Sequence, residues 1–150
     1  MFVQSFEIDN LQALDHALKV PLVQLLDEPD LHPAGDPSQP SYGQMATPAG
    51  LRKIATYADG VGPWKNYIIP RNADDSSGKP TSFVKDARRA GLVVHPYTFR
   101  RENTFVPLEL RSSSDPAGIG DLVSEIRQFI RAGVDGFFTD NADYGVRARS

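Results

Sequence analysis

The sequence of 150 residues contains no cysteine, which excludes a disulfide framework, a thiolate nucleophile and a zinc site built on cysteine. It also lacks an excess of positive charge, since 16 Lys and Arg and 19 Asp and Glu give a formal net charge of -3. A nucleic-acid-binding protein needs a basic face for the phosphates, so this balance argues against that class. Long apolar runs are missing too, and the sequence predicts no membrane-spanning segment.

Motifs that bind phosphate groups or carry an activated nucleophile are also absent. The chain has no G-x-x-x-x-G-K-[ST] or complete G-x-G-x-x-G loop, no G-x-S-x-G elbow and no H-E-x-x-H helix. Gly60-Val61-Gly62 matches only the start of a dinucleotide fingerprint, and Pro63 follows it, which is wrong for that motif. The residues alone therefore assemble no complete catalytic constellation.

Strand-like and helix-like segments alternate along the chain. Apolar runs predict strands at 1–6, 22–26, 59–63, 92–97 and 134–140. Apolar residues at helical spacing predict helices at 11–18, 48–58, 83–90, 122–132 and 141–147. Gly91 and Gly133 leave only short turns between a helix and the next strand, which favours parallel βα units. The sequence therefore predicts an α/β fold, either a small open sheet or part of a barrel.

Local signals predict where these elements begin and end. Four prolines and two glycines between residues 27 and 46 predict a long segment without regular structure. Asp9 or Asn10 is expected to cap the first helix, and Thr47 to cap the next one. Asp140 is expected to cap the last helix, with a place at the rim of the sheet as a secondary role.

In parallel α/β folds the working residues lie at the C-terminal ends of the strands. His95, Tyr97, Thr98 and Arg100 follow an apolar run there, and together their donors can hold an oxyanion. The alternative is a buried, hydrogen-bonded histidine at a strand end with Arg100 solvated, and the residues favour neither interpretation. Glu7 follows the first strand without a second carboxylate beside it, so it is expected to shape a pocket or cap the following helix, and it predicts no metal site.

Five segments of the chain carry weak motifs that gain weight from their order and spacing. They are Gln4-Ser5-Phe6-Glu7, Pro21-Leu22-Val23-Gln24-Leu25, Ala55-Thr56-Tyr57-Ala58-Asp59-Gly60-Val61-Gly62-Pro63, Leu92-Val93-Val94-His95-Pro96-Tyr97-Thr98-Phe99-Arg100 and Ala132-Gly133-Val134-Asp135-Gly136-Phe137-Phe138-Thr139-Asp140. In this order the chain resembles, nearly end to end, the C-terminal half of the glycerophosphodiester phosphodiesterases, in particular the type related to the bacterial periplasmic enzyme.

The resemblance implies the C-terminal βα units of a partial TIM (β/α)8 barrel, with residues 1–150 as part of a single domain whose N-terminal part is absent. It implies metal-dependent hydrolysis of glycerophosphodiesters to sn-glycerol 3-phosphate and an alcohol, with calcium or magnesium in the complete enzyme. The family's N-terminal segments, which carry its H-R-G, E-x-D and H-D motifs and a later Glu and so supply its histidines and metal ligands, do not occur here. The isolated chain is therefore expected to be inactive, without catalytic residues or metal ligands of its own.

What the resemblance assigns to this chain is the distal wall of the substrate cleft. The expected pocket residues are Gln4, Phe6, Gln24, His95, Tyr97, Thr98 and Arg100, with Asp140 nearby. They are expected to orient the substrate and contact its anionic group, while the reaction centre lies elsewhere.

Two other interpretations fit parts of the sequence. A non-catalytic module could bind a phosphorylated ligand or assemble with another chain, and its unpaired strand edges predict self-association. An unrelated doubly wound domain fits the alternation but leaves the ordered motifs unexplained. The partner expected from the resemblance is a small glycerophosphodiester. The sequence leaves the compartment open: periplasmic or secreted if an upstream segment carries an export signal, and cytoplasmic otherwise.

Overall fold

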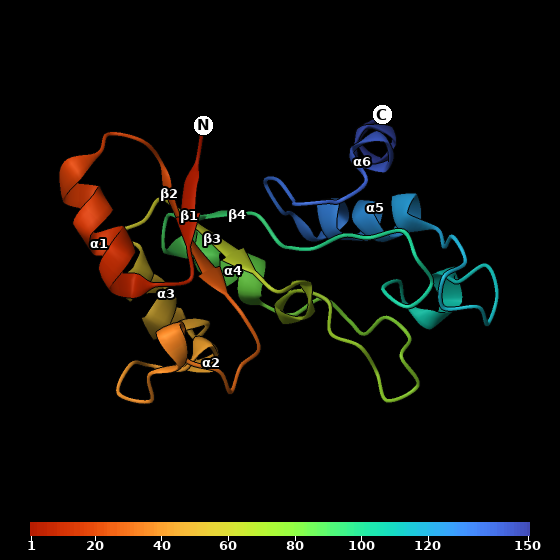
Figure 1. The fold of residues 1–150 in the computed structure, drawn as a ribbon, viewed down its shortest axis with the longest axis horizontal. Coiled ribbons are helices and arrows are strands. Elements are labelled where there is room, and N and C mark those ends of the chain that lie inside the picture. Colours follow the sequence, from red (N-terminus) through yellow and green to blue (C-terminus); the bar gives the residue numbers. More distant parts are fainter.

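Strands and helices alternate in the computed structural model, which describes residues 1–150 (Figure 1). The strands are β1 (Val3–Ser5), β2 (Leu22–Leu26), β3 (Gly60–Pro63) and β4 (Val93–Val94). The helices are α1 (Ile8–Ala17), α2 (Tyr42–Met45), α3 (Pro48–Ile54), α4 (Phe83–Arg89), α5 (Leu122–Ala132) and α6 (Ala142–Arg149). Short 3-10 turns add η1 (Pro33–Gly35), η2 (Lys65–Tyr67) and η3 (Leu108–Leu110). None of the helices has the length and apolar character that crossing a lipid bilayer requires.

The strands form one parallel sheet in the order β1-β2-β3-β4, so each strand pairs with the next one along the chain. An isolated parallel bridge between Phe99 and Thr139 follows β4. Right-handed crossovers in a sequentially ordered sheet place all connecting helices on the same face, as in a barrel. A doubly wound sheet instead reverses its strand order and carries helices on both faces. The sequential order therefore excludes the doubly wound alternative, and the predicted partial barrel is confirmed.

The two faces of the sheet are covered differently. Leu22 and Leu26 of β2 belong to the apolar core beneath the helices. Their neighbours Val23 and Leu25 point to the opposite face, which is the inside of the barrel, because side chains alternate along a strand. A Cβ atom added to Gly62 of β3 would lie only 2.6 Å from Cδ2 of Leu25. The absence of a side chain at Gly62 therefore provides the space that the Leu25 side chain of β2 occupies.

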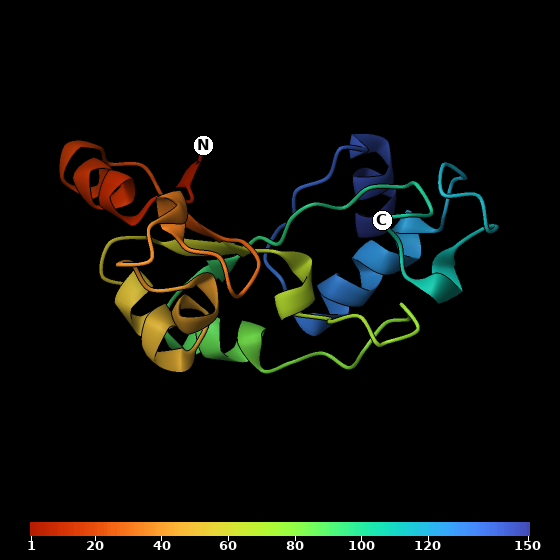
Figure 2. The same ribbon diagram turned by 60° about the horizontal axis from the view of Figure 1, so that its bottom comes forward.

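Helices α5 and α6 form a second lobe beside the sheet, and both views show the chain crossing to it after β3 and after β4 (Figure 2). The Asp121 carboxylate caps α5 by accepting a hydrogen bond from the Ser124 amide at 3.0 Å. Gly133 ends the helix in the left-handed conformation, with φ of 99°. Ile126 and Phe129 of α5 are buried in the same core cluster as the sheet residues. A single apolar core therefore runs through both lobes.

The structure corrects the prediction that residues 27–46 lack regular structure, because this segment contains η1 and α2. Helix α2 has a complete capping box. The Gln44 amide donates to Oγ of Ser41 at 3.3 Å, and the Ser41 amide donates to Oε1 of Gln44 at 2.9 Å. The spacing of Ser41 and Gln44 is the S-x-x-Q signal for a helix start, and the surrounding prolines obscured it.

Two predicted caps are also wrong. Helix α1 begins at Ile8 with Glu7 as its N-cap, as the alternative for Glu7 expected, so Asp9 and Asn10 lie inside the first turn, where the charge of Asp9 still favours the helix dipole. Helix α6 begins after Asn141, and Asp140 instead forms an ion pair with Arg100. The predicted strand at 134–140 is reduced to the bridge at Thr139. By contrast, Oγ1 of Thr47 accepts from the Gly50 amide at 3.1 Å, which confirms the predicted cap of α3.

We expect Gly50→Ala in the first turn of α3 to destabilise the protein, although alanine is normally the better helix residue by about 1 kcal/mol. An added Cβ would lie 2.4 Å from the carbonyl oxygens of both Gln44 and Met45, and backbone cannot move aside cheaply. The free energy of unfolding, measured in urea, is expected to fall by about 1–3 kcal/mol. Ala49→Gly at the neighbouring exposed position is the control for the propensity term alone. A rise in stability for Gly50→Ala would contradict this packing argument.

Candidate functional site

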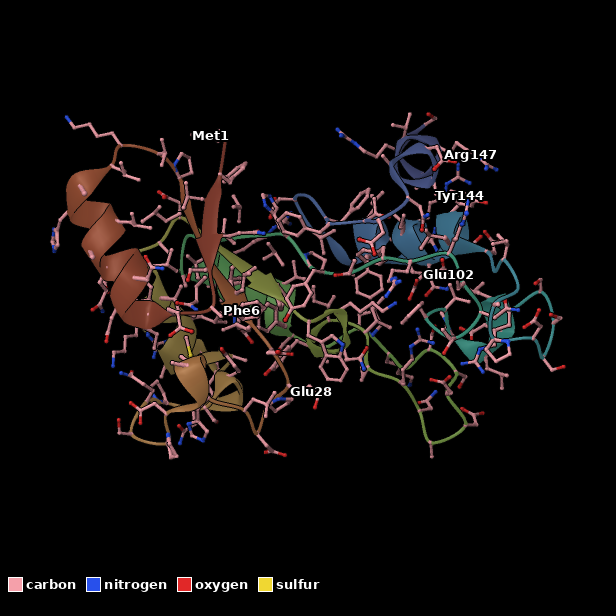
Figure 3. All side chains as sticks on the ribbon, viewed as in Figure 1. Met1, Phe6, Glu28, Glu102, Tyr144 and Arg147 are labelled. Atoms are coloured by element: carbon pink, nitrogen blue, oxygen red, sulfur yellow. The ribbon has the colours of Figure 1, made fainter.

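Aromatic side chains gather at the C-terminal ends of the strands. The ring of Phe6, just after β1, lies 5.9 Å from that of Tyr97 and 6.2 Å from that of Tyr42, both edge to face. Trp64, just after β3, forms a parallel bridge with Tyr97. In Figure 3, Phe6 and Glu28 both lie at the end of the sheet opposite to Met1. We call Phe6, Tyr42, Trp64 and Tyr97 the aromatic rim.

Burial favours the neutral form of both phenol groups of the aromatic rim. Burial, assisted by the charges of Glu7 and Asp27, raises the pKa of Tyr42 to about 12. Burial also raises the pKa of Tyr97, with Asp27 again contributing. The Tyr97 hydroxyl donates to the Leu26 carbonyl at 2.9 Å, which ties it to the end of β2. The rim therefore presents apolar ring surfaces beside carboxylates at neutral pH.

Gln24, a predicted pocket residue, lies on β2 but faces the helix layer and is 0% exposed. Its Oε1 accepts a hydrogen bond from the Tyr57 hydroxyl at 2.9 Å, and its Nε2 donates to the Phe6 and Leu25 carbonyls, each at 3.0 Å. The amide thus fixes the backbone where the chain leaves β1. In this structure Gln24 acts on the position of Phe6, and its contact with substrate stays a prediction.

Gln4 and His95 both belong to the inner face of the sheet. Gln4 is exposed and pairs in register with Val23. The His95 imidazole is half-buried between aromatic rings, 5.0 Å from Phe2 and 6.3 Å from Phe138. Burial lowers the pKa of His95, although the charge of Asp135 acts in the opposite direction. Burial therefore favours the neutral imidazole, which packs among aromatic rings.

Arg100 is carried away from the aromatic rim by the segment that leads to the second lobe. Its Nε lies 3.2 Å from Oδ2 of Asp140, and its guanidinium lies 4.0 Å from the centre of the Phe105 ring. The side chain is 42% exposed, so its outer donors remain open to an anion. Thr98 is half-buried beside Tyr97. The structure therefore brings Phe6 and Tyr97 together and places Arg100 in a separate ion pair.

Two charged residues that were not predicted as functional, Lys65 and Glu125, are buried in the structure. A lysine inside the apolar stretch from Gly60 to Ile69, and a glutamate among the buried positions of the α5 pattern, were the available signals. Tyr42 was missed because its segment was predicted to be irregular.

The chain brings together no group of three or more His, Cys, Asp or Glu side chains that could hold a metal ion. Glu7 and Asp27 flank the aromatic rim, but a hard cation such as Ca²⁺ needs six or more oxygen ligands. The residues of this chain therefore do not fit a cation site by themselves, and no chemical step is derived from them through one.

A sequence profile of the Glycerophosphoryl diester phosphodiesterase family matches residues 1–144. The chain belongs to this family. The predicted family membership is thus confirmed, over nearly the full length of the chain.

Individual relatives show the same likeness. The chain is 34% identical over 140 residues to a glycerophosphodiester phosphodiesterase of Arabidopsis thaliana, covering 93% of this chain and 35% of the relative. It is 24% identical over 164 residues to a glycerophosphodiester phosphodiesterase of Haemophilus influenzae, covering 97% of this chain and 41% of the relative. The chain therefore spans somewhat more than a third of the length of these curated relatives.

Solved structures of low sequence identity share the fold. A crystal structure from Silicibacter pomeroyi, assigned as a glycerophosphoryl diester phosphodiesterase, superposes with a TM-score of 0.58 at 19% identity. The superposition covers 98% of this chain and 37% of the Silicibacter pomeroyi chain. One from Agrobacterium tumefaciens with the same assignment gives 0.55 at 16% identity, covering 97% of this chain and 42% of the other. This phosphodiesterase family member thus has the arrangement of part of a larger barrel.

Proposed function

We propose that this chain forms the C-terminal βα units of a glycerophosphodiester phosphodiesterase, which hydrolyses a glycerophosphodiester to sn-glycerol 3-phosphate and an alcohol. The observation that carries the proposal is the family match over residues 1–144. The sequential parallel sheet supports it, because its strand ends lie at one edge, where barrels of this kind place their working residues.

Within that enzyme, the chain supplies the distal wall of the substrate cleft. Phe6 and Tyr97 offer ring faces to the apolar backbone of the substrate, and Gln24 holds Phe6 in place. Arg100 offers guanidinium donors to the anionic group, since only one edge of the guanidinium is taken by Asp140. Gln4, His95 and Thr98 complete the proposed wall. These residues orient the substrate, and none of them is proposed to transfer a proton.

In this proposal the catalytic histidines and the ligands of a calcium or magnesium ion lie outside residues 1–150, on N-terminal βα units. The absence of a cation-binding group of side chains in this chain is consistent with that division. The isolated chain is accordingly proposed to be inactive.

The test compares the isolated chain with a chimera that joins the N-terminal βα units of the Arabidopsis relative to residues 1–150. Release of glycerol 3-phosphate is measured from glycerophosphocholine and glycerophosphoethanolamine, with calcium, with magnesium and with chelator. We expect no release by the isolated chain and a cation-dependent rate at least about 10³-fold higher for the chimera. Tyr97→Ala in the chimera is expected to raise KM more than it lowers kcat, because Tyr97 contacts the substrate away from the reacting bond.

Circular dichroism and a cooperative thermal transition establish that each protein is folded before its activity is compared. A folded chimera without cation-dependent release would contradict the assigned reaction. Chelator-insensitive or cation-dependent turnover by the isolated chain would contradict the proposed division of labour, while leaving the reaction itself in place.

A second candidate is a non-catalytic module that assembles with a further chain. It is favoured by the edge of β1, which pairs only with β2, and by the exposure of Met1 at 93% and Phe2 at 50%. An open strand edge beside apolar side chains seeks a partner. The solution mass of the isolated chain distinguishes the candidates, because a self-sufficient module is expected to be a stable monomer or a closed dimer.

A further inference from the structure

A group of three charged side chains, the buried Lys65 and Glu125 and the partly buried Arg71, lies where the two lobes meet. Nζ of Lys65 lies 2.7 Å from Oε1 of Glu125, and Nη2 of Arg71 lies 3.3 Å from the same oxygen. Both cations also donate to the Phe105 carbonyl, each at 2.8 Å. Lys65 belongs to η2 after β3, and Glu125 belongs to α5, so the group joins the sheet lobe to the helical lobe.

Joining the two lobes through these charges carries a large desolvation free energy. Lys65 is 7% exposed and Glu125 is 2% exposed, so both charges are withdrawn from water. Burial lowers the pKa of Lys65 and raises that of Glu125, against their mutual attraction. Oε2 of Glu125 is buried without a hydrogen-bond partner. Buried ion pairs with these features add little net stability over a packed apolar pair, so the geometry that they impose is the better explanation for them.

The backbone at Lys65 is hydrogen-bonded to the aromatic rim. The Lys65 amide donates to the Tyr97 carbonyl at 3.0 Å, and the Trp64 amide donates to the Leu26 carbonyl at 2.8 Å. The Tyr97 amide donates to the Pro63 carbonyl at 3.1 Å. The position of the Lys65 backbone is therefore coupled to the peptide units that place Trp64 and Tyr97.

We propose that the Lys65–Glu125 ion pair positions the aromatic rim: it holds the turn after β3 against α5 and so sets where Trp64 and Tyr97 stand. Glu125 is a positioning residue that acts through Lys65 and does not touch the substrate. Its consequence for substrate orientation rests on the proposed function. The placement of Trp64 does not depend on that function, and it can be measured without any substrate.

Trp64 is the only tryptophan of the chain, so its fluorescence reports on this position alone. Two variants of the 150-residue chain test the proposal. Glu125→Gln keeps the shape of the side chain and removes its charge, and the double variant Lys65→Met with Glu125→Leu replaces the ion pair by an apolar pair of similar volume. Asp143→Asn on α6, an exposed carboxylate without an ion-pair partner, is the matched control.

We expect acrylamide quenching of Trp64 to rise roughly twofold both in Glu125→Gln and in the double variant, because the turn is released from α5. The emission of Trp64 is expected to shift to longer wavelength in both. The double variant is expected to unfold in urea at or above the wild-type midpoint. The control is expected to match wild type in both measurements. If Trp64 becomes more accessible while the urea midpoint is retained, the ion pair positions the turn and does not merely stabilise the fold.

Wild-type emission and quenching in the double variant would overturn the proposal, because apolar packing would then position the turn equally well. A double variant that fails to fold would also overturn it, since the ion pair would be a stability element. An equal change in Asp143→Asn would show that the fluorescence follows any loss of surface charge, with the same consequence. None of these outcomes depends on whether the chain takes part in phosphodiester hydrolysis.

Discussion

Replacing Glu125 with alanine is expected to lower the free energy of unfolding by about 3–5 kcal/mol, because it removes one partner of a buried ion pair. Lys65 would keep only the Phe105 carbonyl, which it shares with Arg71, while Arg71 would also keep its contacts with Asp75. Urea denaturation at pH 7, followed by circular dichroism and extrapolated linearly, measures the change. For a domain of this size, a loss of that order removes a large share of the total stability.

Two comparisons show whether stranded charge is the cause of this loss. The double variant Lys65→Met with Glu125→Leu removes both charges together and is expected to regain the wild-type value or exceed it. Asp143→Asn, which removes an exposed carboxylate, is expected to stay within about 0.5 kcal/mol of wild type. Equal losses in the double variant and in Glu125→Ala would mean that the volume of these side chains matters and that their charge does not.

Replacing Phe99 with alanine is expected to lower the free energy of unfolding by about 3–5 kcal/mol. Phe99 is 0% exposed, and its ring lies 4.9 Å from that of Phe129 and 5.8 Å from that of Phe137, both edge to face. Nζ of Lys65 lies 5.5 Å from the centre of the same ring. The deletion would leave a cavity at the junction of the two lobes, and thermal or urea unfolding measures its cost.

Phe99→Leu is the matched control, because it keeps most of the volume and is expected to cost less than about 1.5 kcal/mol. Hydrogen exchange adds a local measurement: amides of α5 are expected to lose protection before those of β2 and β3 in Phe99→Ala, since Phe99 packs directly on α5. A loss below 1 kcal/mol for Phe99→Ala would show that the lobes can close over the missing ring.

Much of the fold was predictable from local sequence signals. The apolar run Leu22–Leu26 predicted a buried strand, and all of its residues are buried. Thr47 and Gly133 marked the start of α3 and the end of α5 because their hydrogen-bonding and conformational preferences act within a few residues. Predictions were wrong where two local signals compete. At Ser41, for example, the capping box starts a helix although the surrounding prolines predict an irregular segment.

The candidate site was less predictable, because it depends on which residues the fold brings together. The sequence indicated Phe6 and Tyr97 only as separate strand ends, and the structure places their rings 5.9 Å apart. It grouped Tyr97 with Arg100, but the chain turns between them toward the second lobe, and Arg100 pairs with Asp140. Gln24 belongs to the predicted strand, yet only pairing with β1 and β3 decides that its side chain faces the helices.

By itself, the sequence determined the alternation of strands and helices, most element boundaries, and the family through its ordered motifs. Periodicity and caps are short-range effects, so they survive in the sequence of a single chain. Only the tertiary structure decided the sequential strand order, the aromatic rim at one end of the sheet and the buried pair of Lys65 with Glu125. The two residues of that pair are 60 positions apart, and no local pattern encodes a contact over that separation. Burial made this pairing necessary, since neither charge is stable in the core without the other.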